Sequence, residues 1–392
     1  MVIGFERGVG SLMPTAHAKL GASNAHRWLH CGGSVKAEQG FKDQSSPFAY
    51  EGTCAHELSE LALLHGKEPQ EWIGKPLVEN SEWVVDDEMA NYVQVYTDYC
   101  RAIAKGADET FIEQRVSYAD WVPEGFGTND FGALFLKDKR IKIADLKYGK
   151  GVQVDAENNP QAMLYGLGTY AEFSWLSEFE WVDIAIIQPR LDHISEWSIS
   201  VKDLLKWAEW VSQRAEIALS DDAERVPGEK QCRFCKAKGT CPALMKYTED
   251  IIMAEFDDLD DMPSPDMLTQ EQLRRVLEHK GLIEGWLSSV ETVVRERLES
   301  GEDFPGFKIV EGRSLRKWGD EIEAEKALAD ILGDDLYTKK LISPAQAEKA
   351  LPKADRKMLE GLVVKPAGKP TLAPESDKRP PINLSEGDFE SC

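Results

Sequence analysis

The stretch KIADLKYGKG, residues 142–151, places an acid and a base at the end of an apolar strand. Ile141 and Ile143 precede Asp145 and Lys147, and because side chains alternate along a strand, all four lie on one face. Charged groups avoid an apolar core, so this face leaves the core near the strand end. There the pair can line a cleft. The alternative is an ordinary surface ion pair, which is common and contributes little energy.

The segment just before this strand supplies a second carboxylate. GTNDFGAL, residues 127–134, contains Asp130 between two glycines that permit a tight strand entry and a close approach of backbones. If the two strands form a hairpin, Asp130 reaches the strand end that carries Asp145. Two carboxylates beside a lysine form the type of site that holds a divalent cation for phosphodiester hydrolysis.

Two helices around these strands add polar side chains at helical spacing. His56 and Glu60 are four residues apart, and so are Gln161 and Tyr165, so each pair lies on one helix face. Simple packing or a solvated helix surface explains either pair alone. Together with the two carboxylates and the lysine, they favour a common site.

The order of elements predicts an α/β fold with a mixed sheet. Short alternating segments separated by turn residues are typical of strands, and amphipathic segments of helices. We expect helices over 50–66, 86–106, 159–174 and 201–219, and strands over 109–118, 127–138, 140–148 and 181–190.

Changes in composition predict four parts of the chain. We expect an α/β domain with a cysteine cluster over 1–248, an acidic linker over 249–268, a smaller, mostly helical accessory region with a hairpin over 269–364, and a disordered tail over 365–392.

The overall charge limits how the chain can meet nucleic acid. A net charge of −23 argues against a protein that coats DNA by bulk electrostatics. Any contact must be local, and the basic stretches over 137–150 and 230–238 are candidates, although solvated lysines explain each charge taken alone. No apolar run approaches the roughly 20 residues that span a bilayer, and the N-terminus lacks a signal-peptide pattern. We therefore expect a cytoplasmic protein.

Four of the seven cysteines suggest a metal or cluster site. Cys232, Cys235 and Cys241 form a compact group, and Cys31 is available as a fourth ligand. An odd cysteine count in a cytoplasmic chain argues against a disulfide framework. Spacing alone leaves zinc and iron–sulfur open.

These motifs resemble those of RecB-like nucleases of the PD-(D/E)XK superfamily. The matching residues appear in the expected order and on the expected elements: His56 in GTCAHELSE, Asp130 in GTNDFGAL, Asp145 and Lys147 in DLK, and the pair Gln161 and Tyr165. The resemblance implies a restriction-endonuclease-like core: a small mixed sheet flanked by helices.

The resemblance also implies roles for the site residues. His56, Asp130, Asp145 and the backbone carbonyl of Leu146 would hold Mg²⁺ or Mn²⁺, and Lys147 would position the attacking water. Contacts to DNA would come from Gln161, Tyr165 and Lys150, and Glu113 and Glu60 are weaker candidates for the site.

A second resemblance concerns the cysteines. AddB-type and CRISPR-associated RecB-like enzymes place one cysteine before the nuclease core and three after it. That resemblance implies a [4Fe–4S] cluster held by Cys31, Cys232, Cys235 and Cys241, with a structural role. A Cys₄ zinc site remains the alternative.

The whole chain resembles RecB-like proteins of bacteriophages and prophages. This resemblance implies a DNA nuclease that acts in phage recombination or DNA processing, and we expect it to be an exonuclease. The resemblance implies a single-strand annealing protein as a partner. A helicase would be another partner, because the chain contains no phosphate-binding G-x-x-x-x-G-K-[ST] loop and therefore no visible ATP motor. The alternative is a non-cleaving DNA-binding or scaffold module that retains the fold. A further hypothesis makes the acidic segment 255–266 a phosphate mimic over the DNA groove.

Overall fold

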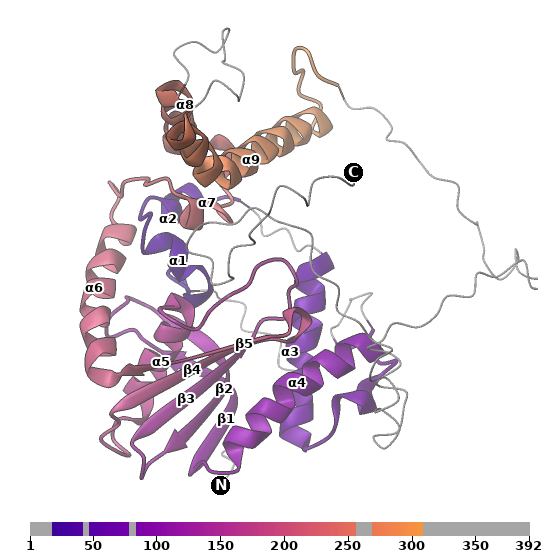
Figure 1. Cartoon of the computed structure of the whole chain (residues 1–392), viewed down its shortest axis with the longest axis vertical. Coiled ribbons are helices and arrows are strands. Elements are labelled where there is room, and N and C mark those ends of the chain that lie inside the picture. Colours follow the sequence, from indigo (N-terminus) through magenta and orange to yellow (C-terminus); the bar gives the residue numbers. More distant parts are fainter. Residues whose placement is uncertain (1–17, 42–46, 78–83, 256–268, 309–392) are drawn as a thin grey trace, which may run out of the picture. The chain divides into compact units, whose positions relative to one another are not determined.

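Among the described residues, the helices are arranged around one mixed five-stranded sheet, with its strands in the order β1-β2-β3-β4-β5 (Figure 1). The computed structural model describes residues 18–41, 47–77, 84–255 and 269–308. The strands are β1 (Glu109–Ser117), β2 (Phe126–Phe135), β3 (Arg140–Leu146), β4 (Trp181–Gln188) and β5 (His193–Ser200). The predicted α/β class, a mixed sheet flanked by helices, is confirmed.

The strand connections explain why the sheet is mixed. β2 pairs antiparallel with β1 on one side and with β3 on the other. β3 and β4 are parallel, because the chain crosses between them through α5 (Pro160–Phe173). β5 then returns antiparallel to β4. β5 was absent from the sequence prediction.

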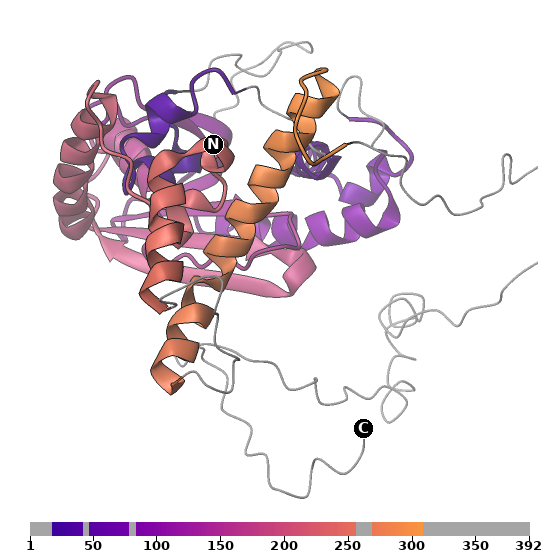
Figure 2. The ribbon, with the colours of Figure 1, turned by 90° about the horizontal axis from the view of Figure 1, so that it is seen from above.

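Helices cover both faces of the sheet (Figures 1 and 2). α5 and α6 (Val201–Leu219) pack on one face, where Ile143, Val182 and Leu204 lie in a continuous apolar core. α3 (Pro47–His65) and α4 (Asp87–Ala104) pack on the other face in a second core that includes Tyr96 and Leu146.

Side-chain caps fix the starts of three of these helices. Asp86 accepts a hydrogen bond from the Met89 N–H at the start of α4. Asn159 caps α5 in the same way, directly before Pro160, and Ser200 caps α6. Capping of this kind satisfies backbone donors that the first helical turn leaves free. The sequence-predicted starts near 86, 159 and 201 are confirmed.

The alternation of β1 shifts once, at Glu113. Phe111 and Val116 both lie in the α5/α6 core although five residues separate them, and in a regular strand that spacing would place them on opposite faces. Glu113 has a φ of 47°, in the left-handed region that non-glycine residues rarely adopt. Because of this shift, Ile112 and Glu113 both face α3 and α4.

Nine further helices are present among the described residues. They are η1 (Ala22–Asn24), α1 (Ala25–Trp28), α2 (Ser34–Ala37), η2 (Pro69–Trp72), η3 (Pro189–Leu191), α7 (Glu229–Cys232), η4 (Lys238–Thr240), α8 (Pro242–Glu255) and α9 (Gln270–Glu299). α9 is a single helix that packs on α7, α8 and η4. Gly239 permits this contact, because a Cβ there would lie 2.7 Å from the backbone oxygen of Ser289.

Several sequence predictions fall on other parts of the chain. The predicted acidic linker begins inside α8, and residues 256–268 lie outside the described residues, as do the accessory hairpin and short helices after 308 and the tail over 365–392. Among the described helices, none combines the length and apolar character needed to cross a membrane.

Candidate metal centre

The site lies where β2 and β3 separate, which we call the β2–β3 fork. The paired positions of these strands end at Phe131 and Ala144. One residue further, the side chain of Asp130 replaces a backbone partner: its Oδ2 accepts a hydrogen bond of 2.8 Å from the Leu146 N–H. The fork therefore holds a buried carboxylate in a fixed position. The Leu146 carbonyl, which the resemblance implies as a metal ligand, stays a prediction.

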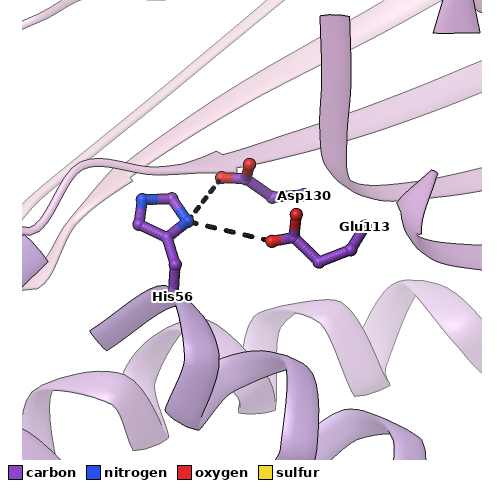
Figure 3. Close-up of side chains that lie close together, drawn as sticks. All are labelled: His56, Glu113 and Asp130. Carbon is purple, nitrogen blue, oxygen red and sulfur yellow. Dashed lines mark ion pairs between the residues drawn. The ribbon is translucent and has the colours of Figure 1, made fainter. Parts of the chain in front are cut away.

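Three side chains from three elements converge at the fork (Figure 3). His56 Nδ1 on α3 lies 3.4 Å from Asp130 Oδ2 and 4.0 Å from Glu113 Oε1. One ligand atom of each residue lies within 4.8 Å of the others, so the three residues could hold a metal ion. Carboxylate oxygens are ligands that Mg²⁺ and Mn²⁺ favour, and imidazole nitrogen is a ligand for divalent transition metals. We call His56, Glu113 and Asp130 the metal triad.

Glu113 reaches the triad because of its backbone conformation. In the β1–β2 register, Glu113 lies opposite Asp130, between the pairs Ile112–Phe131 and Gln114–Asn129. Its left-handed φ turns the carboxylate toward α3 and His56. Residues held in sparsely populated backbone regions often mark functional sites, because the surrounding structure must maintain them.

Burial and like charges disfavour ionised carboxylates in the triad. Burial raises the pKa of Glu113 to about 9, and the nearby charges of Asp130, Glu60 and Glu57 act in the same direction. Burial also raises the pKa of Asp130, against the opposing effect of His56. A divalent cation removes this penalty by supplying positive charge, so the triad favours a bound cation over two bare carboxylates.

A second group of side chains lies beside the triad, on the α5 side of the sheet. Lys147 Nζ lies 2.7 Å from Asp145 Oδ2 and donates a hydrogen bond of 3.1 Å to Gln161 Oε1. The Gln161 amide in turn donates to the Tyr165 hydroxyl at 3.0 Å. We call Asp145, Lys147, Gln161 and Tyr165 the lysine group.

The two groups interact electrostatically. Burial lowers the pKa of Lys147, but the carboxylates of Asp145 and Asp130 outweigh it, and the net shift is upward. Lys147 is therefore an ammonium ion at neutral pH, held between the triad and α5. A fixed ammonium group can donate to a water or to a phosphate oxygen.

The structure thus distributes the predicted site residues over two groups. His56 and Asp130 lie together with Glu113, the weaker sequence candidate, whereas Asp145 contacts Lys147 and is not one of the three triad residues. Glu60 lies close enough to raise the pKa of Glu113. Lys150 is exposed and lies 3.6 Å from Glu88.

All four predicted cluster cysteines line one cavity of about 20 Å³. They come from segments about 200 residues apart in the chain: Cys31, Cys232, Cys235 and Cys241. Backbone donors point at two of the sulfurs, with Val226 N 3.3 Å from Cys31 Sγ and Gly228 N 3.4 Å from Cys232 Sγ.

The glycine pair after Cys31 brings these segments together. At Gly33, a Cβ would lie 2.7 Å from the carbonyl oxygen of Ala223, so only glycine lets the chain after α6 approach this closely. This approach places Val226 next to Cys31. Burial raises the pKa of the Cys31 thiol, and raises that of Cys235 to about 12, so a metal must displace protons to bind here.

A buried ion pair joins the segment around Cys31 to the segment that contains Cys232 and Cys235. Arg27 Nη2 lies 2.9 Å from Glu38 Oε2, with 8% and 13% of the two side chains exposed. Arg27 also donates to the backbone carbonyl of Phe234, between Cys232 and Cys235, and Glu38 accepts from the Lys236 N–H. Sequence analysis did not identify this pair, because nothing in the sequence indicates that these charges are buried.

Most charges in the basic stretch 137–150 have acidic partners. The pairs are Lys139 with Glu180, Arg140 with Asp183, Lys142 with Asp183, Lys147 with Asp145, and Lys150 with Glu88. The stretch is therefore close to neutral and does not form a basic surface.

A mixed five-stranded sheet flanked by helices, with a His–Glu–Asp cluster at a strand fork, defines an α/β protein with a candidate metal-binding site. The chain belongs to the family described as "Protein of unknown function (DUF2800)", which matches residues 17–380. Among solved structures, the chain is similar to the one described as "Crystal structure of SSO0001", with a TM-score of 0.27 and 12% identity over 57% of this chain and 85% of that chain. At these values the similarity carries no argument about function.

Proposed function

We propose that this protein is a divalent-metal-dependent deoxyribonuclease with a RecB-like PD-(D/E)XK core. The observation that carries the proposal is the metal triad next to Lys147: ligand atoms from His56, Glu113 and Asp130 lie within 4.8 Å of one another. A divalent cation bound there supplies charge neutralisation at a phosphate and lowers the pKa of a coordinated water. The element order and the positions of the triad and the lysine group support the same proposal.

The chain's own residues then have distinct tasks. The metal triad holds the cation. Lys147, kept protonated by Asp145 and Asp130, donates to the attacking water or to a phosphate oxygen. Gln161 keeps the ammonium group in place through its Oε1, and its amide is in turn held by Tyr165. The fork orients Asp130 through the Leu146 N–H before any substrate arrives.

Cleavage assays with the full chain test this function. End-labelled linear DNA and a closed circle are incubated with Mg²⁺ or Mn²⁺; loss of the linear DNA alone indicates an exonuclease. Asp130→Asn and Lys147→Met should each abolish cleavage. The matched controls are Asp138→Asn and Lys137→Met, which change the same charges at the exposed turn between β2 and β3. Equal cleavage by all four variants would refute the proposal.

We propose that the cysteine cavity holds a [4Fe–4S] cluster, with zinc as the alternative. Four thiols line one cavity, and two backbone N–H groups point at the sulfurs, a contact that stabilises thiolate ligands. The role of such a group here is structural, since it joins the first and last segments around the sheet. Anaerobic purification should yield a brown protein that contains iron. A colourless protein with stoichiometric zinc would contradict the cluster.

One observation favours the second hypothesis, a DNA-binding module that does not cut. Asp145 is engaged with Lys147 and is not one of the triad residues. If this pairing persists with metal bound, Asp145 does not contribute its carboxylate to the cation, and the site lacks one of the ligands that the nuclease resemblance implies. DNA that binds tightly but stays intact with both metals, in cluster-loaded protein, would support this module over the nuclease.

A further inference from the structure

Arg115 lies on the same strand face as the metal triad. It follows Glu113 by two residues on β1, a distance of about 7 Å between Cα atoms. Val116 points into the α5/α6 core, so its neighbour Arg115 points to the opposite face, where Glu113 and His56 lie. The side chain of Arg115 is exposed.

An aromatic ring holds the guanidinium group in place. Arg115 Cζ lies 3.8 Å from the centroid of the Phe126 ring. Arg115 pairs with Thr128 in the β1–β2 register, so Phe126 is its diagonal neighbour on the same face. A guanidinium stacked through its plane keeps its N–H edge available, and that edge matches the geometry of a phosphate group.

Arg115 also differs from most cations of the basic stretch, because acidic side chains offset the charges of those cations. Among the described residues, no carboxylate lies within ion-pair distance of Arg115, whereas Lys139, Arg140, Lys142, Lys147 and Lys150 each have an acidic partner. In a chain with a net charge of −23, a positioned and unneutralised cation next to a metal site has a strong effect on where an anion can approach.

We propose that Arg115 binds a backbone phosphate of the DNA next to the phosphate at the metal triad. This inference rests on the proposed function and adds a substrate contact to it. The triad holds one phosphate through its cation, and Arg115 holds a neighbouring one, so that the two contacts set the direction of the strand across the fork. Arg115 is a positioning residue for the substrate and has no part in holding the metal.

The test is the salt dependence of DNA binding, measured by fluorescence anisotropy with a short labelled duplex. Ca²⁺ replaces Mg²⁺, and a gel confirms that the duplex stays intact. Arg115→Met should weaken binding about fivefold to tenfold and reduce the slope of log affinity against log salt by about 0.9, the value for one phosphate contact. Arg115→Lys should restore the slope, because the charge returns, but only part of the affinity, because the planar fork is lost.

Lys137→Met is the matched control, since it removes one exposed positive charge at the opposite end of the β2–β3 hairpin. It should leave affinity and slope within twofold of the wild type, and Arg115→Met should leave Mn²⁺ affinity unchanged. If the wild type binds and cuts DNA while Arg115→Met shows the same affinity and slope, the inference is wrong and the nuclease function stands. If the wild type neither binds nor cuts DNA, both fall together.

Discussion

Asp130 and Leu146 are joined by a hydrogen bond from the Leu146 N–H to the Asp130 carboxylate, 2.8 Å long. Asp130 is one of the three triad residues, and its carboxylate also takes the place of a backbone partner at the point where β2 and β3 separate. This arrangement predicts how the site responds to substitution, because a carboxylate that could bind a metal ion also maintains local structure.

The first prediction concerns Asp130→Asn. The amide retains an oxygen that can accept the Leu146 N–H but is a much weaker ligand for a hard cation. Mn²⁺ affinity should fall by at least about tenfold, a loss of about 1.4 kcal/mol, measured by calorimetry. Without metal, the melting temperature should stay the same or rise, since burial already disfavours the ionised carboxyl. Asp138→Asn is the control, and equal Mn²⁺ affinity in both variants would count against the triad.

The second prediction is a pH dependence from Glu113. Its pKa is raised from 4.5 to about 9, so in metal-free protein the folded state keeps a proton that the unfolded chain has released. The contribution of Glu113 to the free energy of unfolding is fully present below pH 4.5. It is lost as the pH rises toward 9, by at most about 1.4 kcal/mol per pH unit. Melting temperatures measured across this range in EDTA should fall.

Glu113→Gln provides the comparison, because its amide stays neutral over the whole range. The variant should lose part of the decline, and Mn²⁺ should reduce the decline in the wild type by neutralising the site. A decline of the same size in the variant and the wild type would show that other groups cause it.

The third prediction concerns the cysteine cavity. Cys31→Ser should reduce iron or zinc content to well below one equivalent and lower the melting temperature, because the chain's two distant segments lose their common ligand set. Cys54→Ser is the control, a buried cysteine on α3 that does not line the cavity. Equal metal content in both variants would exclude Cys31 as a ligand. Metal analysis and thermal melts supply the readouts.

The fourth prediction concerns the ion pair between Arg27 and Glu38. Arg27→Lys keeps the charge, but an ammonium group cannot bind Glu38 and the Phe234 carbonyl with the same planar geometry. In metal-free protein, the cavity thiols should react faster with a thiol reagent. Lys36→Met should not change the rate of thiol modification, since the ion pair of Lys36 with Asp221 lies on the exposed surface. Equal rates for both variants would mean that the pair does not order the cavity.

The fifth prediction concerns Gly132 on β2. A Cβ at this position would lie 1.9 Å from a ring atom of Phe111, which is itself buried. Gly132→Ala should lower the free energy of unfolding by about 1–3 kcal/mol through overpacking. Gly149→Ala, where nothing lies within 4 Å, should change it by less than about 0.5 kcal/mol. Urea unfolding curves measure both, and equal midpoints would contradict this packing.

Local rules explain what the sequence could reveal of the site. Strand alternation placed Asp145 and Lys147 together, and the structure has them 2.7 Å apart. Helical spacing placed Gln161 beside Tyr165, and they share a hydrogen bond. Gln161 and Tyr165 lie on one helix, and Lys147 directly follows the strand that carries Asp145, so the geometry of each pair follows from a local period alone.

Other features required tertiary contacts that no local period encodes. The turn of Glu113 toward His56 depends on one left-handed residue in a strand that otherwise reads as regular. β5 was missed although HISEWSIS alternates, because its charged and polar residues weaken the apolar signal of an edge strand. The neutral character of the basic stretch depends on acids from β4 and α4, which lie far away in the sequence.

The cysteine cavity also has a consequence for biosynthesis. Cys31 leaves the ribosome about 200 residues before Cys232 and Cys241, a delay of roughly 10 to 40 s at ordinary translation speeds. Until then, Cys31 is the only one of the four proposed ligands in the nascent chain. A metal or cluster that needs all four cysteines would therefore be loaded only after the sheet and α6 have emerged.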